Sequence, residues 1–460
     1  MTALNRPTSR RLLLATALTL SLGAVAPGVA TAVPERTGAA ASTAPTDTAR
    51  AVIEDIERHS HRLRTADPAA RGGDLAALTR MVGSATVVGV GEATHGSREL
   101  FQLKDRLFRQ LVRTAGFTTF ALETSWSSGA RLDAYVRNGE GDLRQIMREE
   151  FQQSYADWNN EEFLTLFTWM REYNRSLAPE RRLRVLGDDI NDVHPAQIRR
   201  ILDWAAGHRP TLAPELRQRY AGMLALPADA GERMDGWLTM PLERRQSLDR
   251  DVTAAFRLLE RSGGVDPLVL QEARVITQMT SGFARDLNDP AQMAELNRLR
   301  DRAMAENTVW WQRHTGGRIL LSAHNGHLGY ETPFPETHPV VQGHYLRELM
   351  GSRYLAIGTT LHGGEYWATD SGTGKPGYFT AGPAAPGSNE HTIDRVRHRD
   401  YYVDLRSLAR TPAAGPWLAG ARPTFVIPSQ YPSEPLPVSL GRTFDVLVHF
   451  ERVAGARILT

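Results

Sequence analysis

Four apolar segments of this 460-residue chain have the pattern of a buried β-strand, and each runs directly into polar residues. The segments are residues 85–91, 117–122, 184–187 and 318–323. The polar residues that follow them are, in order, Glu92 with His95, Glu123, Asp188 with Asp189, and His324 with His327. In an open α/β sheet, ligands bind beyond the carboxyl ends of the strands. The pattern therefore predicts that the four strand ends form one shared site.

Composition and charge are those of an ordinary globular protein, with 41% hydrophobic and 23% charged residues. The formal net charge is +2, and the first 32 residues contribute three arginines and no acidic residue, which leaves −1 for the rest. This balance indicates neither a nucleic-acid partner nor an anionic membrane. The chain contains no cysteine, which excludes disulfides and thiolate chemistry.

The N-terminus has the order of features of a secretory signal peptide. Arg10 and Arg11 precede an apolar run over residues 12–25, and a small-residue sequence that ends at Ala32 follows. This order predicts a signal peptide over residues 1–32 and a secreted protein. The arginine pair also fits a twin-arginine signal, so both export routes stay open. No later segment is long and apolar enough to span a bilayer.

After a linker expected at residues 33–48, residues 49–460 are predicted to form one α/β domain. Helical spacing at 97–114, between the first two strands, indicates a βαβ unit and therefore parallel strands. Helical patterns dominate the chain that follows, and the part from about 190 to 315 is expected to form a lobe over the cleft. The predicted fold is thus a central, mostly parallel sheet flanked by helices. Later strands are expected at residues 354–360, 422–427 and 444–450, and a Gly- and Pro-rich loop at 370–388.

The sequence E-A-T-H-G-S at residues 92–97 stands where the first strand is expected to turn into a helix. Because histidine titrates near neutral pH, His95 could take a proton from water and return it to a leaving group. Glu92 could orient the ring or take part in the proton transfer. The motif is equally compatible with a structural turn whose histidine caps the helix.

Two histidines three residues apart, His324 and His327, can converge on one point at a strand end. Such a pair could bind a metal ion with Glu or Asp completing the ligand set, or it could bind an oxyanion without a metal. One functional and one packed histidine is a third interpretation. Glu123 and Asp189 are compatible with a site and equally with a salt bridge or a turn.

Three common catalytic signatures are absent. There is no G-x-S-x-G nucleophile motif, the G-T-G-K sequence at 372–375 lacks the pattern of a phosphate-binding loop, and no third glycine follows Gly89 and Gly91 in the dinucleotide-binding register. A hydrolase that uses histidine-activated water is the simplest enzyme that remains.

Six motifs then run in a fixed order over most of residues 85–450. They are G-E-A-T-H-G-S at 91–97, K-x-R-L at 104–107, G-F-T-T-F-A-L-E at 116–123, R-D-R-A-M-A-E-N at 300–307, H-N-G-H at 324–327 and G-H-Y-L-R-E at 343–348. In these motifs the chain resembles the erythromycin esterase family. The resemblance implies a macrolide-lactone esterase fold with a helical lobe beside the cleft.

The resemblance also implies roles for individual residues. His95 would be the general base for the hydrolytic water, and the rest of the catalytic site would comprise Glu92, Glu123, His324 and His327. Substrate contacts would come from Lys104, Asp189 and His344. The family often has arginine at the position of Lys104, and lysine keeps the charge without the bidentate fork.

The leading hypothesis is therefore a secreted hydrolase of carboxylic esters or lactones, without a cofactor, whose partner is a small-molecule substrate. Opening of a macrolide ring, and with it antibiotic resistance, is one form that this activity could take. A metal-dependent hydrolase with His95, His324, Glu123 and Glu92 as ligands is an alternative. A non-catalytic binding protein on the same scaffold is another.

Overall fold

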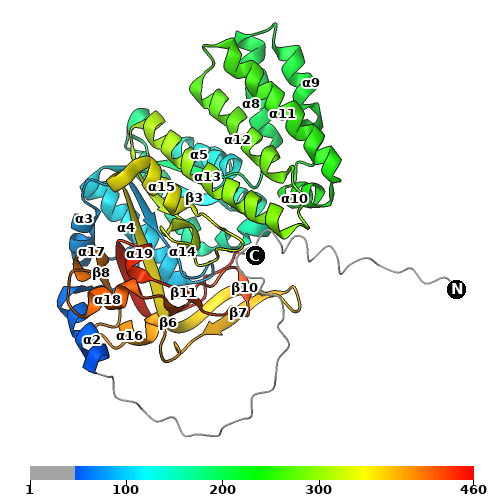
Figure 1. Ribbon diagram of the computed structural model, residues 1–460. Coiled ribbons are helices and arrows are strands. Elements are labelled where there is room, and N and C mark those ends of the chain that lie inside the picture. Colours follow the sequence, from blue (N-terminus) through cyan, green and yellow to red (C-terminus); the bar gives the residue numbers. More distant parts are fainter. Residues whose placement is uncertain (1–46, 460) are drawn as a thin grey trace, which may run out of the picture.

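The computed structural model describes residues 47–459, and a ten-stranded sheet forms its centre (Figure 1). Eight strands follow the order β1-β8-β12-β6-β2-β5-β3-β4, while β7 and β10 both pair with β6. Their bounds are β1 Ser60–Arg62, β2 Val87–Val90, β3 Phe117–Ser125, β4 Arg184–Asp189, β5 Arg318–Ser322, β6 Tyr354–Asp370, β7 Pro376–Ala381, β8 Tyr401–Asp404, β10 Gln430–Tyr431 and β12 Val446–Val453. A second sheet pairs β9 (Arg422–Thr424) with β11 (Leu436–Val438). The predicted signal peptide and nearly all of the predicted linker lie outside the described residues.

The middle of the large sheet is parallel, as predicted. Neighbouring strands from β12 through β6, β2, β5 and β3 to β4 all pair in parallel, and only β1, β8 and β7 run antiparallel to their partners. In β2, Val88 and Val90 pack on one face of the sheet and Val87 packs on the other. Apolar side chains on both faces are typical of a strand in a parallel sheet that helices cover on both sides.

The four strands read from the sequence are adjacent in the sheet, in the order β2-β5-β3-β4. The register pairs Val90 with Ser322, and Ser322 with Leu122, so the carboxyl ends of β2, β5 and β3 lie level. The predicted βαβ unit consists of β2, α4 and β3, but its two strands are not neighbours. Strand β5, which comes much later in the chain, lies between them. The strands β3 and β4 also run further than expected, and therefore Glu123 and Asp189 belong to the strands themselves.

The remaining elements are mostly helices. Outside the lobe these are α2 Asp47–His59, α3 Ala76–Val82, α4 Arg98–Ala115, α5 Trp126–Asn138, α6 Leu143–Glu150, α7 Glu161–Asn174, α13 Pro290–Thr315, α14 Asn325–Leu328, α15 Gln342–Met350, α16 Asn389–Ile393, α17 Leu405–Leu408, α18 Ala414–Ala419 and α19 Leu440–Thr443. The 3-10 turns are η1 Gly72–Leu75, η2 Gln153–Trp158, η3 Pro179–Arg181 and η4 Gly351–Arg353. The leucine stripe of α4 is buried against the sheet as its spacing predicts, and Gly116 ends the helix with a positive φ of 67°.

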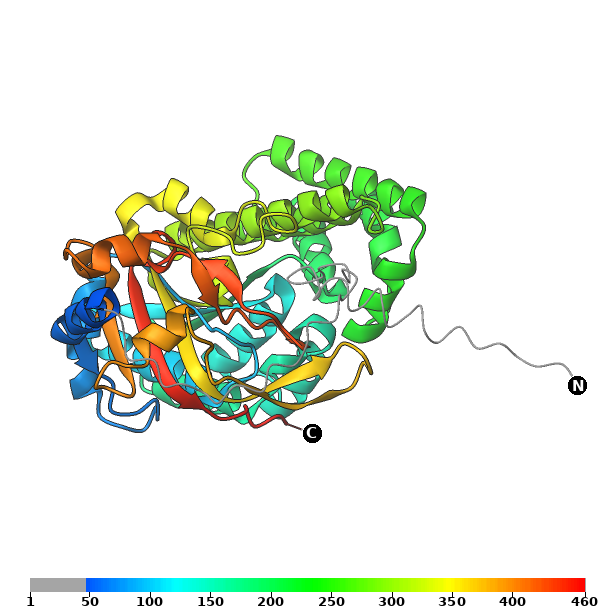
Figure 2. The same cartoon turned by 60° about the horizontal axis from the view of Figure 1, so that its bottom comes forward.

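A lobe of five helices stands apart from the sheet (Figures 1 and 2). It comprises α8 Pro195–His208, α9 Ala213–Leu224, α10 Ala230–Thr239, α11 Leu242–Ser262 and α12 Pro267–Phe283. Its own core includes Tyr220 and Trp237, which are fully buried. The lobe is joined to the end of the sheet by a buried ion pair, in which Arg233 Nε donates to Asp192 Oδ1 over 2.7 Å. The long helix α13 then leads the chain back to β5, so the predicted helical insert is present.

The prediction of a loop over residues 370–388 is wrong in part. Residues 376–381 form β7, which pairs antiparallel with the far end of β6 as a hairpin. The prediction failed because β6 has 17 residues and continues well past the apolar segment at 354–360. Its last part is stabilised by pairing and by aromatic contacts with β7, such as that of Tyr366 with Phe379, rather than by an apolar run of its own. No helix within residues 47–459 is long and apolar enough to cross a bilayer.

Candidate active site

The four strand ends contact one another through their backbones and side chains. The backbone N–H of Asn325 donates to the carbonyl of Glu92 over 2.9 Å, which joins the ends of β5 and β2. The backbone N–H of His324 donates to Glu123 Oε2 over 2.9 Å, which joins β5 to β3. On the far side, Arg300 of α13 bridges Glu123 and Asp189 of β4. One connected set of polar groups thus runs along this edge of the sheet.

His95 follows β2 at this edge, and only one of its two ring nitrogens has a hydrogen-bond partner among the described residues. Its Nδ1 lies 2.7 Å from Glu92 Oε1, and because a carboxylate can only accept, Nδ1 carries the proton. Its Nε2 has no hydrogen-bond partner among the described residues, and the residue retains 5% exposure. The ring packs against Trp158 and His324, at centroid distances of 5.4 and 4.8 Å. In its neutral form, His95 therefore leaves Nε2 without a proton or a hydrogen-bond partner among the described residues, on a side chain that keeps a small exposed area.

The turn that carries His95 requires glycine at position 96. A Cβ at Gly96 would stand 1.9 Å from the carbonyl oxygen of Trp367, because the backbone of β6 passes directly beside it. The N–H of Trp367 donates to the Gly96 carbonyl over 3.0 Å. Glycine here serves this close approach, and the Cβ that any other residue brings would push the turn and His95 away from β6.

The pKa of His95 is raised although burial acts in the opposite direction. Burial lowers it, but the hydrogen bond and charge of Glu92, with the charges of Glu123 and Asp157, outweigh that effect. The carboxylate of Glu92 is itself held by the ammonium of Lys104, which also donates to Ser322 Oγ over 3.0 Å. Burial lowers the pKa of Lys104. Glu92 thus lies between a cation and a histidine and couples the two.

Lys104 does not reach the surface of the site. Its side chain has no exposed area, and its nitrogen lies behind Glu92 among groups of β5. This placement does not fit the expected direct contact with a substrate. It fits a positioning residue that fixes the carboxylate on which His95 depends.

A second histidine, His327, is enclosed between two carboxylates. Its Nδ1 lies 2.6 Å from Asp301 Oδ1, and its Nε2 lies 3.3 Å from Glu123 Oε1. Burial lowers the pKa of His327, yet Asp301 and Glu123 raise it overall to about 9. The pKa of Glu123 falls well below its usual range because His327, His95 and Arg300 outweigh its burial. His327 is therefore a buried cation without a free nitrogen.

His324 makes two contacts that need a neutral ring. Its Nδ1 accepts from the N–H of Gly326 over 3.1 Å, so its Nε2 carries the proton and donates to the carbonyl of Ile427 over 3.2 Å. Burial, with the charges of His95 and His327 acting in the same direction, lowers its pKa well below 6.5. The ring caps α14 and has no N–H left for an oxyanion, which does not fit the expected role in oxyanion binding.

The two aspartates at the end of β4 have different partners. Asp189 accepts from Arg300 Nε over 2.9 Å and from the hydroxyl of Tyr155 over 3.0 Å. Asp188 instead accepts from Thr308 Oγ1 over 2.9 Å, beneath α13, and burial raises its pKa to about 8. Asp189 thus belongs to the site edge, although it is fully buried and already bonded, and acts there by fixing Arg300.

His344 is not part of this site. It lies on α15, its side chain is 47% exposed, and its Nε2 pairs with Glu348 one turn along the same helix. Other residues of α15 face inward on both sides of His344, and the backbone N–H of Gln342 donates to Asp301 Oδ1 over 2.8 Å. The structure therefore separates His344 from the other predicted site residues.

Within residues 47–459, no group of three His, Cys, Asp or Glu side chains has the spacing of a metal site. Three of the four ligands expected for a metal-dependent mechanism, Glu92, Glu123 and His324, are bonded to other groups. The nitrogens of His324 contact backbone, and Glu92 is held by Lys104 and His95. The arrangement fits a proton-transfer site better than a preformed ligand set.

A model of the erythromycin esterase family matches residues 112–453. The chain belongs to the erythromycin esterase family. Erythromycin esterase type II of Escherichia coli is 34% identical over 117 residues, which cover 25% of this chain and 26% of that protein.

Solved structures extend the similarity over most of the fold. A Bacillus cereus protein of known crystal structure is 29% identical, with a TM-score of 0.81 over 90% of this chain and 100% of that one. A mutant of erythromycin esterase EreC in its open conformation has a TM-score of 0.67 over 87% of this chain and 99% of that one. At 17% identity, the second likeness shows the fold alone.

Several residues of the site were not among those predicted from the sequence. Arg300 and Asp301 stand in the R-D-R-A-M-A-E-N motif, so that family motif was the available signal for them. Tyr155 and Asp157 come from the short turn η2, which follows no apolar strand and has no motif. These two residues reach the site only because the chain folds back from α6 over the strand ends.

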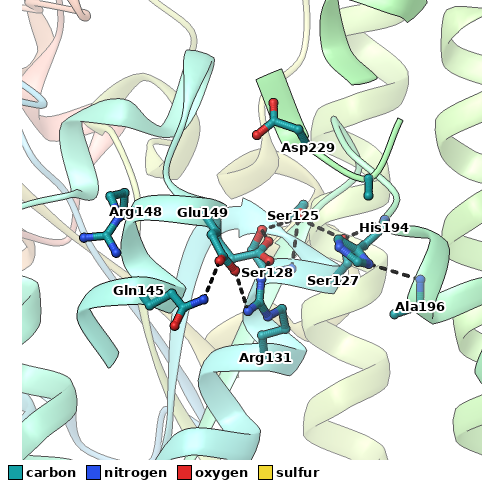
Figure 3. Close-up of polar contacts among 12 residues, drawn as sticks. Ser125, Ser127, Ser128, Arg131, Gln145, Arg148, Glu149, His194, Ala196 and Asp229 are labelled. Carbon is teal, nitrogen blue, oxygen red and sulfur yellow. Dashed lines mark hydrogen bonds and ion pairs between the residues drawn. The ribbon is translucent and has the colours of Figure 1, made fainter. Parts of the chain in front are cut away.

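Next to the strand ends lies a polar network at the start of α5 (Figure 3). Ser125 caps the helix by accepting from the N–H of Ser128 over 3.0 Å, and Ser128 Oγ donates to Glu150 over 2.7 Å. The N–H of His194 donates to Ser127 Oγ over 3.2 Å. The three serines are buried and bonded to one another. The network therefore ties the ends of β3 and α6 to the start of α8, and it does not present a serine nucleophile.

Proposed function

We propose that this member of the erythromycin esterase family hydrolyses carboxylic esters or lactones with water activated by His95. The observation that carries the proposal is the one-sided environment of His95, whose Nδ1 is fixed by Glu92 while Nε2 has no hydrogen-bond partner among the described residues. In the proposed step, Nε2 takes a proton from water as the water oxygen attacks the ester carbonyl. This geometry and the family membership support the general-base role.

Arg300 is the group best placed to stabilise the oxyanion. It is a cation, its side chain keeps 9% exposure, and Asp189 and Glu123 orient it. His327 and Lys104 are also cationic but are fully enclosed by their carboxylates. A fixed cation in a site with little water stabilises developing negative charge without reorganising.

The proposal is tested with purified protein and a panel of aryl esters, alkyl esters, lactones and macrolides. Ester or lactone turnover by the wild-type protein is expected. Turnover should fall as the pH drops through a value above 6.5, because protonated His95 cannot accept the proton of water. Absence of turnover over the whole panel, with tight binding of one member, would instead favour a binding protein.

The same panel separates the metal-independent mechanism from the metal-dependent one. Metal content is measured in the purified protein, and turnover is compared before and after chelation. Unchanged turnover in metal-free protein is the expected result. Turnover that is lost on chelation and restored by one divalent ion would contradict the mechanism proposed for His95.

We also propose that the protein is exported, and that its partner is a small ester or lactone, with macrolides among the candidates. The first proposal rests on the apolar run and the small-residue sequence that ends at Ala32. N-terminal sequencing of protein from culture supernatant should find a start at or near Val33, and an intact Met1 there would contradict it. The macrolide candidate rests on the E. coli relative named erythromycin esterase type II, and comparison of macrolide and simple-lactone turnover tests it.

A further inference from the structure

A carboxyl group that the His95 mechanism does not use lies beside His95. Asp157 belongs to η2 and is 7% exposed, slightly more than His95 itself. The next residue, Trp158, packs its ring edge-on against His95. The charges of Asp157 and His95 are close enough for each to shift the pKa of the other. Asp157 thus lies close to His95 and keeps a small exposed area.

Asp157 is held in place by a segment that also contacts the strand ends. Ser429 Oγ donates a short hydrogen bond to Asp157 Oδ2. Two residues earlier, the N–H of Ile427 donates to the carbonyl of Ala93 over 2.8 Å, and the Ile427 carbonyl accepts from His324. The segment at 427–429 therefore fixes Asp157 relative to the turn that carries His95.

The surroundings of Asp157 favour the protonated acid more than an ordinary surface aspartate does. Burial raises its pKa to about 6, while His95 and the Ser429 hydrogen bond act in the lowering direction and Glu92 acts in the raising direction. No Lys or Arg side chain forms an ion pair with Asp157 among the described residues. A carboxyl group that titrates near the working pH is suited to acid catalysis.

Ester hydrolysis needs two proton transfers, and a single histidine supplies one at a time. As water attacks, its proton goes to His95 Nε2. When the tetrahedral intermediate collapses, the C–O bond breaks with its electron pair on the leaving oxygen, which then needs a proton. An alkoxide of an aliphatic alcohol or an opened lactone is strongly basic and leaves slowly without a proton, whereas a nitrophenolate leaves without one.

We propose that Asp157 is a second catalytic residue, whose carboxylic acid contacts the leaving oxygen and donates its proton as the C–O bond breaks. This inference rests on the proposed function. The products are the free alcohol and the acid, with Asp157 left as carboxylate and His95 protonated. Transfer of the proton from His95 to Asp157, through water, restores both groups. The pair thereby favours substrates with poor leaving groups, namely aliphatic esters and lactones.

The test compares Asp157→Asn with wild type on two acetate esters, p-nitrophenyl acetate and ethyl acetate. Asparagine keeps the size and can accept from Ser429, but it has no acidic proton. We expect kcat/KM to fall by about 10²-fold on the alkyl ester and by less than about tenfold on the aryl ester, in the range of lost general-acid catalysis. Ser429→Ala keeps the carboxyl group of Asp157, so it should change kcat/KM by a similar factor on both esters.

Equal losses on both esters, or no loss on either, would overturn the inference and leave Asp157 a structural residue. A second measurement needs no variant. In wild type, the alkyl ester should give a bell-shaped pH profile of kcat/KM, because its turnover needs neutral His95 together with protonated Asp157, whereas the aryl ester should show only the acid limb. Identical pH profiles for the two esters would also overturn it. Absence of any ester turnover by wild type would overturn the proposed function itself, which is a separate outcome.

Discussion

His95 and His327 follow two neighbouring strands, and each points Nδ1 at a carboxylate, Glu92 at 2.7 Å and Asp301 at 2.6 Å. They differ at the other nitrogen. The Nε2 of His95 has no partner among the described residues, whereas that of His327 lies 3.3 Å from Glu123. One ring can therefore gain and lose a proton at an open position, and the other is enclosed as a cation.

The difference shows that the second contact of a histidine decides its role. Neighbouring carboxylates raise the pKa of both histidines, although burial lowers it. With one carboxylate contact, the ring gains basicity and stays available to water. With two carboxylate contacts, both ring nitrogens of His327 are engaged inside the protein. The histidine then holds Glu123 in place and, through Glu123, the backbone of His324. The first arrangement suits proton transfer and the second suits support of the site.

The largest expected effect is on His95. His95→Asn keeps a polar side chain of similar reach but cannot accept the proton of water in the same way, so ester turnover should fall by about 10²–10⁴-fold. Steady-state kinetics on an activated ester measure the loss, and the melting temperature should stay near that of wild type. A His95→Asn variant with most of its turnover would remove the distinction between the two histidines.

Lys104→Ala should cost stability as well as turnover. The ammonium is fully buried against Glu92, and removing one member of a buried ion pair typically costs about 3–5 kcal/mol. Urea unfolding of the variant and of wild type measures the difference in unfolding free energy. This expectation differs from that of a substrate-binding lysine at the surface, for which stability would be unchanged.

Loss of Lys104 should also change the pH profile of activity. Without the nearby cation, Glu92 acts on His95 with less opposition, so the acid limb of kcat/KM should move to higher pH. The residual activity of Lys104→Ala is measured across that limb. A limb at the wild-type position would show that Lys104 does not act on His95 through Glu92.

The enclosed histidine predicts a dependence of stability on pH. The pKa of His327 is about 9 in the folded protein and 6.5 when unperturbed, so the folded state binds this proton more tightly. Its stabilisation is fully present below about 6.5 and is lost as the pH rises through about 9. Unfolding free energies measured across this window should decline, and the slope should be smaller for His327→Gln. The raised pKa values of His95 and Asp188 add to this slope in the same direction.

The smallest expected effect is on the histidine outside both clusters. His344→Ala removes only an exposed pairing with Glu348, so turnover should be unchanged and the unfolding free energy should change by less than about 0.5 kcal/mol. The variant is a control for the other substitutions. A large loss of turnover would place α15 in substrate binding, against the position seen in the structure.

The sequence by itself was sufficient to predict the four strands β2, β5, β3 and β4, the helical insert, and the edge at which these strands end. Apolar runs that end in Glu92, Glu123, Asp189 and His324 predict adjacent parallel strands, because a fully buried strand needs apolar side chains on both faces. The reach of β6 and the hairpin with β7 could not be predicted in this way. Pairing with distant strands stabilises them, and such pairing leaves no local pattern.

The role of each polar side chain was decided only by the tertiary structure. Lys104, His324 and His344 carry no local signal that they would be, respectively, buried behind Glu92, bonded to backbone, and exposed on α15. Lys104 and His324 each have a partner more than 100 residues away, Ser322 and Ile427 respectively. Charge, proton affinity and access depend on such neighbours, so the sequence determined which groups meet at the sheet edge and the fold determined which of them can react.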